Sequence, residues 1–394
     1  MLKTNFGDRT INMHQRKILF IDHTAVLGGA ELSLLDLATA YRQRSQVILF
    51  ADGVLRSRLE SAGVKVKVIE VSEKVLELRA SGGLKALKTI PELWSLAGKV
   101  AVEAKEFDFI FANSQKAFIV AALATLRNSP PVVWYLHDIL TAKHFSAINR
   151  RIAVSLANRF AAKVLVNSQA TGKAFVAAGG KQDLTSVVYN GFNSEPFDCV
   201  TDGEARQLRE TLEVADAPLV GLFSRLSYWK GQHILLLAMK ELPALHALFV
   251  GDVLFGEEEY VSYIKNLASE PELKHRVHWL GFRDDIPTLM KACDAIVHTS
   301  TEPEPFGRVI VEGQLAQRPT IASAAGGALE LIEDGVSGLL FPPGDAIALS
   351  KEIQKVISDR TLVDKLAERG YHSAKANFNL AAILDSFEQG ISEI

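Results

Sequence analysis

The stretch from residue 295 to residue 312 has the sequence Ala295-Ile-Val-His298-Thr-Ser-Thr-Glu302-Pro-Glu304-Pro-Phe306-Gly307-Arg-Val-Ile-Val-Glu312. Its first four residues form a short apolar run that predicts a strand, and Pro305-Phe306-Gly307 opens a helix whose first turns carry Glu312. A strand, a polar loop and a helix in this order form one βα unit of a parallel sheet. Ligands of such sheets bind beyond the carboxyl ends of the strands, so this loop is a candidate binding site.

Similar units extend in both directions from this stretch, and the alternation predicts an α/β fold with two doubly wound domains facing a cleft. Helices are expected between the strands, including one from Leu84 to Lys105 that is broken at Pro91. In the first half we expect strands at Lys17–Asp22, Gln46–Phe50, Lys65–Val71, Phe109–Ala112, Val132–Leu136, Val164–Val166 and Val187–Tyr189. In the second half we expect them at Leu219–Phe223, Ala247–Gly251, Val277–Leu280, Ala295–His298, Pro319–Ala322 and Gly338–Phe341.

Length and turn residues predict the domain limits. The 394 residues suffice for two to three domains. We expect a loose tail over 1–16, a first domain over 17–195 and a second over 196–370, followed by helices over 371–394. The turn-rich segment Asn190–Pro196 is the predicted linker.

The charge of the chain is unevenly distributed. The net charge is only −3, which argues against a strongly basic nucleic-acid-binding protein. Residues 1–195, however, contain 25 Lys and Arg against 16 Asp and Glu, whereas residues 196–394 contain 18 against 30. Two halves of opposite charge suggest two domains with different partners.

The two cysteines, Cys199 and Cys293, predict no disulfide framework. Residues 1–16 contain no apolar segment typical of a secretory signal. The longest apolar run, around Ala117–Leu126, is about ten residues, and a bilayer-spanning helix needs roughly 20. These features predict a cytoplasmic protein, either soluble or peripheral at the inner face of the membrane.

Several common catalytic patterns are missing from the sequence. It has no G-x-G-x-x-G after a strand, no P-loop, no H-E-x-x-H and no G-x-S-x-G. It also has no D-x-D pair, so a carboxylate-bound divalent cation has no obvious ligands. These absences argue against dehydrogenases, P-loop NTPases, zinc proteases and α/β-hydrolases.

Two candidate sites lie in the first half. Gly28-Gly29-Ala30-Glu31 follows the first strand and begins a helix, whose free N–H groups suit a phosphate. The alternative is a plain βα turn. His137-Asp138 follows the strand Val132–Leu136, where His137 could bond a substrate hydroxyl while Asp138 fixes its tautomer. The alternative here is a capping pair before a helix.

Two further candidates lie in the second half. Arg225 and Lys230 flank a four-residue loop after the strand Leu219–Phe223, and two cations at a strand end would neutralise a diphosphate. The alternative is a pair of solvated surface cations. Glu304 and Glu312 are separated by seven residues, and a carboxylate can accept two hydrogen bonds from a vicinal diol such as ribose. A glycosidase acid–base pair is the alternative for these two carboxylates.

In this order the motifs resemble those of the retaining glycosyltransferases of family 4, which have the two-domain GT-B fold. The matching residues extend over nearly the whole chain. They are Gly28-Gly29-Ala30-Glu31, Tyr189-Asn190-Gly191, Arg225 with Lys230, Gly281-Phe282-Arg283-Asp284, Glu304 to Glu312, and Gly326-Gly327 to Glu330. The chain departs from many relatives at Phe192 and Asn193, and Pro303 and Pro305 on both sides of Glu304 stiffen that loop.

The resemblance implies a hexosyltransferase of polysaccharide biosynthesis that uses a nucleotide-diphosphate sugar, such as a UDP- or GDP-sugar, and needs no metal. It implies that Arg225 and Lys230 bind the diphosphate and that Glu312 binds the ribose. It further implies that Glu304, with the backbone of Phe306 and Gly307, binds the sugar. Phe282 and Arg283 would lie at the base, His137 at the reacting carbon and sugar hydroxyl, and Gly28-Gly29 at the donor phosphate or the acceptor. It also implies that the last helices cross back to the first domain.

Two other functions compete with this one. A nucleotide-sugar 2-epimerase has the same architecture but needs acid–base residues that the sequence does not indicate. A catalytically silent nucleotide-sugar-binding subunit is the second, and the presence of Arg225, Lys230, Glu312 and His137 argues against it. The acceptor is expected to be a glycan, a lipid-linked molecule or a small molecule.

Two basic stretches occur in the first half. Arg79–Lys105 contains five Lys or Arg and two acids, and Lys143–Lys163 contains five and no acid. Basic helices of this kind can lie on an anionic membrane surface. An anionic acceptor or a merely solvated surface would equally explain them.

Overall fold

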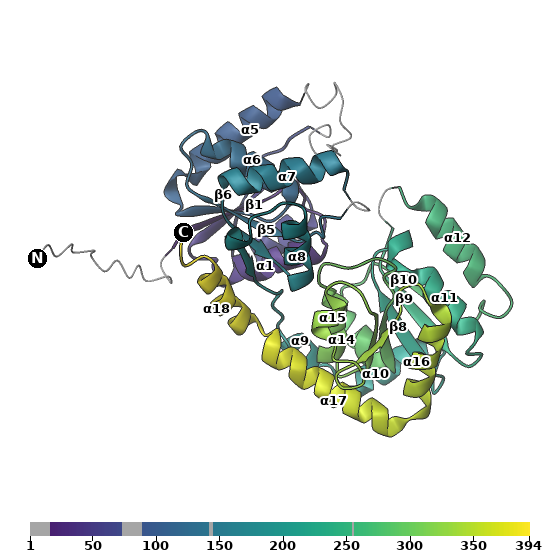
Figure 1. Cartoon of the computed structure of the whole chain (residues 1–394). Helices are drawn as coiled ribbons and strands as arrows, with labels where there is room; N and C mark the ends of the chain where they lie inside the picture. Colours follow the sequence, from purple (N-terminus) through teal and green to yellow (C-terminus); the bar gives the residue numbers. More distant parts are fainter. Residues whose placement is uncertain (1–15, 73–88, 142–144, 254–255) are drawn as a thin grey trace, which may run out of the picture. The chain divides into compact units, whose positions relative to one another are not determined.

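The computed structural model describes residues 16–72, 89–141, 145–253 and 256–394 (Figure 1). The expected tail therefore lies outside the described residues, except for Arg16. The chain forms two compact units. Unit 1 contains residues 1–167, 172–188 and 384–394, and unit 2 contains residues 168–171 and 189–383.

Unit 1 is built on a parallel sheet of seven strands in the order β3-β2-β1-β4-β5-β6-β7. The strands are β1 Ile18–Asp22, β2 Ser45–Leu49, β3 Lys65–Val68, β4 Phe109–Ala112, β5 Val132–Leu136, β6 Ala161–Val166 and β7 Thr185–Val187. The helices of this part of the chain are α1 Gly29–Ala40, α2 Val54–Ser61, α5 Ile90–Glu103, α6 Gln115–Thr125, α7 Ala147–Phe160 and α8 Gln169–Ala177.

The central strands of unit 1 are buried on both faces, which explains their nearly continuous apolar sequences. On one face Phe111 makes edge contacts with Phe20 and Tyr135, at ring-centroid distances of 5.1 and 5.6 Å. Phe387, from the last segment of the chain, completes this cluster 5.6 Å from Phe111. On the other face Trp134 stacks on Phe118 of α6 at 4.6 Å.

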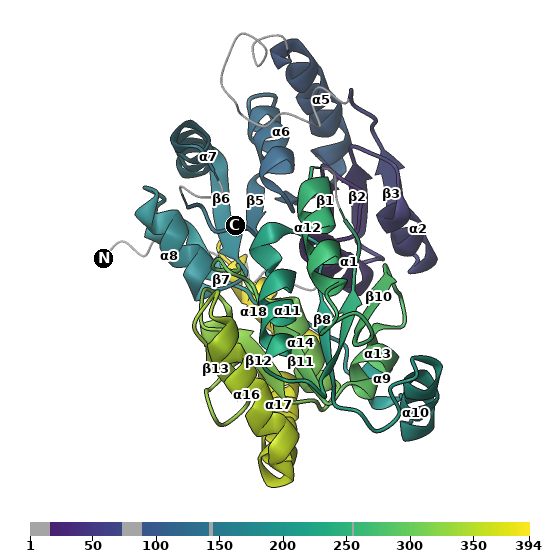
Figure 2. The same ribbon diagram turned by 90° about the vertical axis from the view of Figure 1, so that its right-hand side faces the viewer.

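Unit 2 repeats the design with a parallel sheet of six strands in the order β10-β9-β8-β11-β12-β13, and Figure 2 shows the strands of both sheets. The strands are β8 Leu219–Phe223, β9 His246–Val250, β10 Val277–Gly281, β11 Ala295–His298, β12 Thr320–Ser323 and β13 Leu339–Phe341. The helices are α9 Glu195–Asp198, α10 Asp202–Thr211, α11 Gln232–Lys240, α12 Glu258–Ala268, α13 Ile286–Ala292, α14 Arg308–Leu315, α15 Ala328–Leu331, α16 Ala346–Ser358, α17 Arg360–Asn377 and α18 Leu380–Gly390, the last of which continues into unit 1.

Every expected strand is present, with ends displaced by at most three residues, and the expected α/β class is confirmed. One expectation about a helix is wrong. Pro91 does not break α5; it lies in the first turn, where the missing N–H of proline costs no hydrogen bond. The expected beginning of that helix, at residues 84–88, lies outside the described residues.

The compact units divide the chain differently from the expected domains. The change of unit falls between Val188 and Tyr189, and the expected linker belongs to unit 2. Phe192 in that segment is buried, and its N–H donates to the carbonyl of Phe378 at 2.9 Å. Residues 371–383 also belong to unit 2, and α17, which buries Gly370 and Ala374, continues across residue 371 to Asn377. Only residues 384–394 return to unit 1.

Within the described part of the chain, no helix is both long and apolar enough to cross a bilayer.

Candidate functional site

The predicted ligands of unit 2 lie at the carboxyl ends of adjacent strands. Arg225 and Lys230 follow β8, and Glu304 follows β11, which pairs directly with β8. The two strands therefore bring residues that are about 75 positions apart to one edge of the sheet. Lys230 Nζ lies 2.5 Å from Glu304 Oε1, and both side chains are about 15% exposed, at 14% and 15%.

Two residues that the sequence analysis did not single out complete this cluster. His298, the last residue of β11, places Nε2 2.5 Å from Glu304 Oε2. The Ser300 hydroxyl donates to the same oxygen at 2.8 Å. Both are buried, at 6% and 1% exposed. Ser300 lies two residues after the strand, and that position was the signal that could have identified it, whereas His298 ends the apolar run of the strand itself.

These neighbours stabilise the ionised form of the Glu304 carboxyl group. Burial alone raises the pKa of a carboxyl group, but the charge of Lys230 and the hydrogen bonds from Lys230 and His298 outweigh that effect. The pKa of Glu304 therefore lies well below its ordinary value. An ionised carboxylate at this place can accept hydrogen bonds and cannot donate them.

The loop that carries Lys230 is fixed by a glycine. Residues Tyr228–Lys230 form one turn of 3-10 helix, and Gly231 then takes φ +70°, a conformation that costs glycine little. A Cβ atom on Gly231 would lie 2.1 Å from the carbonyl oxygen of Thr299. The Thr299 hydroxyl in turn donates to the carbonyl of Lys230 at 2.8 Å. This close approach joins the β8 loop to the β11 loop.

Arg225 differs from Lys230 in its surroundings. Arg225 is exposed, and its Cζ lies 5.4 Å from the centre of the Trp229 ring. Lys230 Nζ lies 4.2 Å from the same ring. The indole therefore contacts both cations, and it is a further residue that the sequence analysis passed over.

Backbone contacts with two glycines hold the loop around Glu304. The N–H of Gly327 donates to the Glu304 carbonyl at 2.8 Å. A Cβ atom on Gly326 would lie 2.3 Å from that carbonyl oxygen, and one on Gly327 would lie 2.5 Å from the carbonyl oxygen of Phe306. These contacts explain why the glycines follow β12 in the sequence.

The remaining predicted residues of unit 2 lie nearby in the chain but have different surroundings. Phe306 is buried, and Gly307 caps α14 with φ +97°. Glu312, one turn into α14, lies 3.5 Å from Arg308, and burial raises the pKa of its carboxyl. Phe282 and Arg283 follow β10, the edge strand two places from β8, and both are exposed. Arg283 forms an ion pair with Asp285 at 2.5 Å.

Of the predicted residues of unit 1, His137 belongs to a hydrogen-bonded chain at the carboxyl ends of β1, β4 and β5. Asn113 Nδ2 donates to buried Asp22 at 2.6 Å and to the carbonyl of Ala30 at 3.1 Å. Its Oδ1 therefore faces His137 Nε2, 3.0 Å away, which must carry the proton. Asn113 and Asp22 were not anticipated, because they precede His137 by 24 and 115 residues.

Glu31 lies over the glycine loop of unit 1. A Cβ atom on Gly28 would lie 2.7 Å from Glu31 Oε2. Burial, and after it the charges of Asp22 and Asp138, raise the pKa of Glu31 to about 8. The predicted phosphate loop therefore has carboxyl groups close to it, unlike the cationic edge of unit 2.

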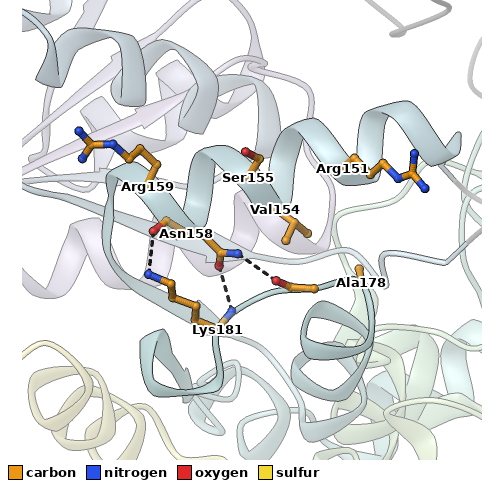
Figure 3. Close-up of a pocket in the computed structure, with 8 residues that line it drawn as sticks. Arg151, Val154, Ser155, Asn158, Arg159, Ala178 and Lys181 are labelled. Carbon is orange, nitrogen blue, oxygen red and sulfur yellow. Dashed lines mark hydrogen bonds between the residues drawn. The ribbon is translucent and has the colours of Figure 1, made fainter.

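A shallow pocket of about 450 Å³ lies on unit 1 between α7 and residues 178–181 (Figure 3). Asn158 joins its walls, accepting from the Lys181 N–H and donating to the Gly179 carbonyl, each at 2.9 Å. The side chains of Arg151 and Arg159 point away from each other. No predicted site residue lines this pocket.

Two family models match the chain. "Glycosyltransferase Family 4" matches residues 27–196, and "Glycosyl transferases group 1" matches residues 204–373. Among curated relatives, the lipopolysaccharide core biosynthesis glycosyltransferase LpsE of Rhizobium meliloti is 33% identical over 175 residues, 44% of this chain and 50% of LpsE. The uncharacterized glycosyltransferase MJ1607 of Methanocaldococcus jannaschii is 31% identical over 182 residues, 45% of this chain and 46% of MJ1607. The chain spans about half the length of these curated relatives.

Solved structures match over the full length. Anabaena Alr3699/HepE in complex with UDP and glucose is 43% identical, with a TM-score of 0.89, and the match covers 96% of this chain and all of that chain. The same protein in complex with UDP-glucose matches with a TM-score of 0.87 at the same identity and coverage. The lipopolysaccharide glycosyltransferase WaaG, 15% identical with a TM-score of 0.72, has the same fold. The expected GT-B class with two Rossmann-like domains is confirmed.

Proposed function

Because the chain belongs to glycosyltransferase family 4, we propose that it moves a hexose from a UDP-sugar to an acceptor hydroxyl with retention of configuration. The observation that carries this proposal is the cluster at the ends of β8 and β11, where Lys230 lies beside a buried, ionised Glu304. HepE, 43% identical over its whole length, has been solved with UDP-glucose, and this supports UDP as the nucleotide of the donor.

The departure of a diphosphate requires positive charge near the leaving oxygen. Lys230 and Arg225 lie on one short loop, on either side of Trp229, and we assign both to the diphosphate. The two side-chain cations supply the charge that a divalent ion supplies in other transferases, so the proposed reaction needs no metal.

The other donor contacts are assigned from the same loops. Glu304 accepts hydrogen bonds from sugar hydroxyls, with help from the backbone of Phe306 and Gly307, and Glu312 accepts them from the ribose. Phe282 and Arg283, after β10, contact the base. Gly28-Gly29 contact the donor phosphate or the acceptor.

In unit 1 we assign His137 to the sugar. Its Nε2 proton is directed to Asn113, and this hydrogen bond fixes the orientation of the imidazole ring. No residue is assigned as a nucleophile. The departing diphosphate takes the acceptor proton on the face from which it leaves, as the family resemblance implies.

A nucleotide-release screen tests the proposal. The purified chain is incubated with UDP-, GDP- and ADP-sugars with EDTA present, and free nucleotide is measured. We expect slow release of UDP from one UDP-sugar without metal. An epimerase leaves the nucleotide attached or releases it with a 2-epimer, and a silent subunit releases none, so either of these results contradicts the proposal.

The acceptor and the location of the protein are proposed from its surface. α7 exposes Ile148 and Ile152, at 59% and 46%, together with Arg151 and Arg159. Such a face suits the inner, anionic surface of a membrane and a lipid-linked glycan acceptor. Co-sedimentation with phosphatidylglycerol vesicles tests this, and absence of binding at low salt contradicts it.

A further inference from the structure

The two oxygens of the Glu304 carboxylate have different partners. Oε1 contacts Lys230 Nζ at 2.5 Å. Oε2 contacts His298 Nε2 at 2.5 Å and the Ser300 hydroxyl at 2.8 Å. The carboxylate is therefore held on one side by a flexible cation and on the other by two polar groups of a single strand end.

The strand-end partners have little freedom to move. His298 is the last residue of β11, and its backbone neighbours pair with β12. Ser300 Oγ lies 3.2 Å from His298 Nε2, so the two side chains contact each other as well as Glu304. Lys230, in contrast, has four rotatable side-chain bonds and belongs to a different loop.

The proton of His298 can be placed from its surroundings. Its Nδ1 is buried and has no hydrogen-bond partner among the described residues. A proton on Nδ1 would leave a buried donor unsatisfied, whereas a proton on Nε2 is donated to Glu304. His298 therefore acts as a hydrogen-bond donor to one oxygen of Glu304.

We propose that His298 and Ser300 are positioning residues that keep Glu304 in place while Lys230 exchanges this carboxylate for the donor diphosphate. The inference rests on the proposed function and adds an order of contacts to it. In the donor-free protein Lys230 neutralises Glu304. When the diphosphate binds, it accepts hydrogen bonds from the Lys230 ammonium group in place of Glu304. Glu304 Oε1 then becomes available to a hydroxyl of the sugar. Oε2 stays fixed by His298 and Ser300, so the carboxylate keeps its orientation.

Substitutions at His298 separate positioning from a purely structural role. His298→Gln keeps an N–H donor near the position of Nε2, whereas His298→Leu keeps the bulk and removes the donor. We expect His298→Leu to lower kcat for the nucleotide sugar about tenfold to a hundredfold, the usual effect of losing a hydrogen bond to a charged group. His298→Gln should recover most of that loss, and UDP should bind both variants within about twofold of the parent, because UDP carries no sugar.

His246→Leu is the matched control. His246 begins β9, at the amino ends of the strands, so this variant makes the same replacement in the same unit away from the cluster at their carboxyl ends. Its kcat should equal that of the parent. Thermal unfolding of all three variants measures how much of any change comes from the fold.

The exchange itself is tested at Glu304. Glu304→Gln frees Lys230 from its ion pair, so isothermal titration should show UDP binding about threefold to tenfold more tightly, while transfer falls. In a double-mutant cycle, His298→Leu should add no further loss of kcat to Glu304→Gln, because the carboxylate that His298 positions is absent from that variant.

The opposite results overturn the inference. At His298, the inference fails if His298→Leu has the parental kcat, or if UDP affinity and kcat fall together in His298→Leu and His298→Gln does not restore them. At Glu304, it fails if Glu304→Gln binds UDP more weakly than the parent, or if the losses of kcat from His298→Leu and Glu304→Gln add in the double variant. The proposed function fails separately, when the parent chain itself releases no nucleotide from any nucleotide sugar.

Discussion

The carboxyl edges of the two sheets are built alike and charged differently. Residues 1–195 have an excess of cations, yet the described edge of unit 1 places Asp22 and Asp138 close enough to Glu31 to raise its pKa. Residues 196–394 have an excess of acids, yet the edge of unit 2 presents Lys230 and Arg225. The charge of a domain is set by its whole surface, whereas a site is set by the few residues at its strand ends.

The rigidity of the two edges differs as well. In unit 2, Gly231, Gly326 and Gly327 allow backbone contacts that leave no room for a Cβ atom, so the loops are locked to one another. In unit 1 side-chain hydrogen bonds hold the site residues in place, because Asn113 bonds both Asp22 and His137. The difference teaches that the proposed phosphate site and the proposed hydroxyl site are ordered in different ways at the same edge of similar sheets. The following predictions test this comparison.

The largest effect should follow from loss of the Lys230 cation, which is only 14% exposed. Lys230→Ala should lower kcat/KM for the nucleotide sugar about a thousandfold, since it removes charge where the leaving group develops it. Arg225→Ala, at an exposed position, should cost less but still about a hundredfold. Steady-state kinetics measure both, with exposed Lys351→Ala as control. Near-parental turnover by Lys230→Ala would show that the cationic edge of unit 2 is not the diphosphate site.

The locked loops of unit 2 predict a loss of stability. Gly231→Ala forces a Cβ atom against the Thr299 carbonyl in a left-handed conformation, and we expect a loss of about 3 kcal/mol. Gly344→Ala is the matched control. Gly344 has a similar φ of +79° with nothing within 4 Å of the added atom, so only about 1 kcal/mol should be lost. Equal urea midpoints for the two variants would contradict the close packing.

Loss of the hydrogen bond between Asn113 and His137 in unit 1 should have a smaller effect on catalysis. Asn113→Leu removes the acceptor for His137 Nε2–H, so both tautomers become populated, and kcat should fall about tenfold. Asn158→Leu, which breaks hydrogen bonds at the pocket of Figure 3, is the control and should leave kcat unchanged. The hydrogen-bonded chain has no role in positioning if the two variants behave alike.

The smallest effect on catalysis is expected at Glu31, where the prediction concerns the pH dependence of stability. The pKa of Glu31 is raised from 4.5 to about 8 in the folded protein, so the fold holds a proton that the unfolded chain releases. The stability from this group is present below about pH 4.5 and is lost as the pH rises towards 8. Glu31→Gln lacks this penalty, so its stability relative to the parent should rise by several kcal/mol, about 4 at most, between pH 4.5 and pH 8. Parallel stability curves would contradict the burial of this carboxyl.

The order of strands and helices could be predicted almost completely from the sequence, because both faces of the parallel sheets are buried and their strands are apolar runs. Residues directly after these strands could also be identified, including Lys230, Glu304 and His137. Their partners could not. His298 belongs to an apolar run, and Asn113 lies on another strand, so their roles depend on which strands are neighbours. Pro91 shows the same limit, since a proline that opens a helix and one that breaks it have the same local sequence.

The return of residues 384–394 to unit 1 has a consequence for synthesis on the ribosome. Phe387 is fully buried against Phe111, and Tyr41 donates to Glu388 at 2.9 Å, so the core of unit 1 lacks these partners while the chain is still growing. At roughly 5–20 residues per second, the interval between residue 188 and residue 384 lasts on the order of ten seconds or more. Unit 1 is translated before unit 2 but lacks residues 384–394 until unit 2 has been translated, so its core is incomplete during that interval.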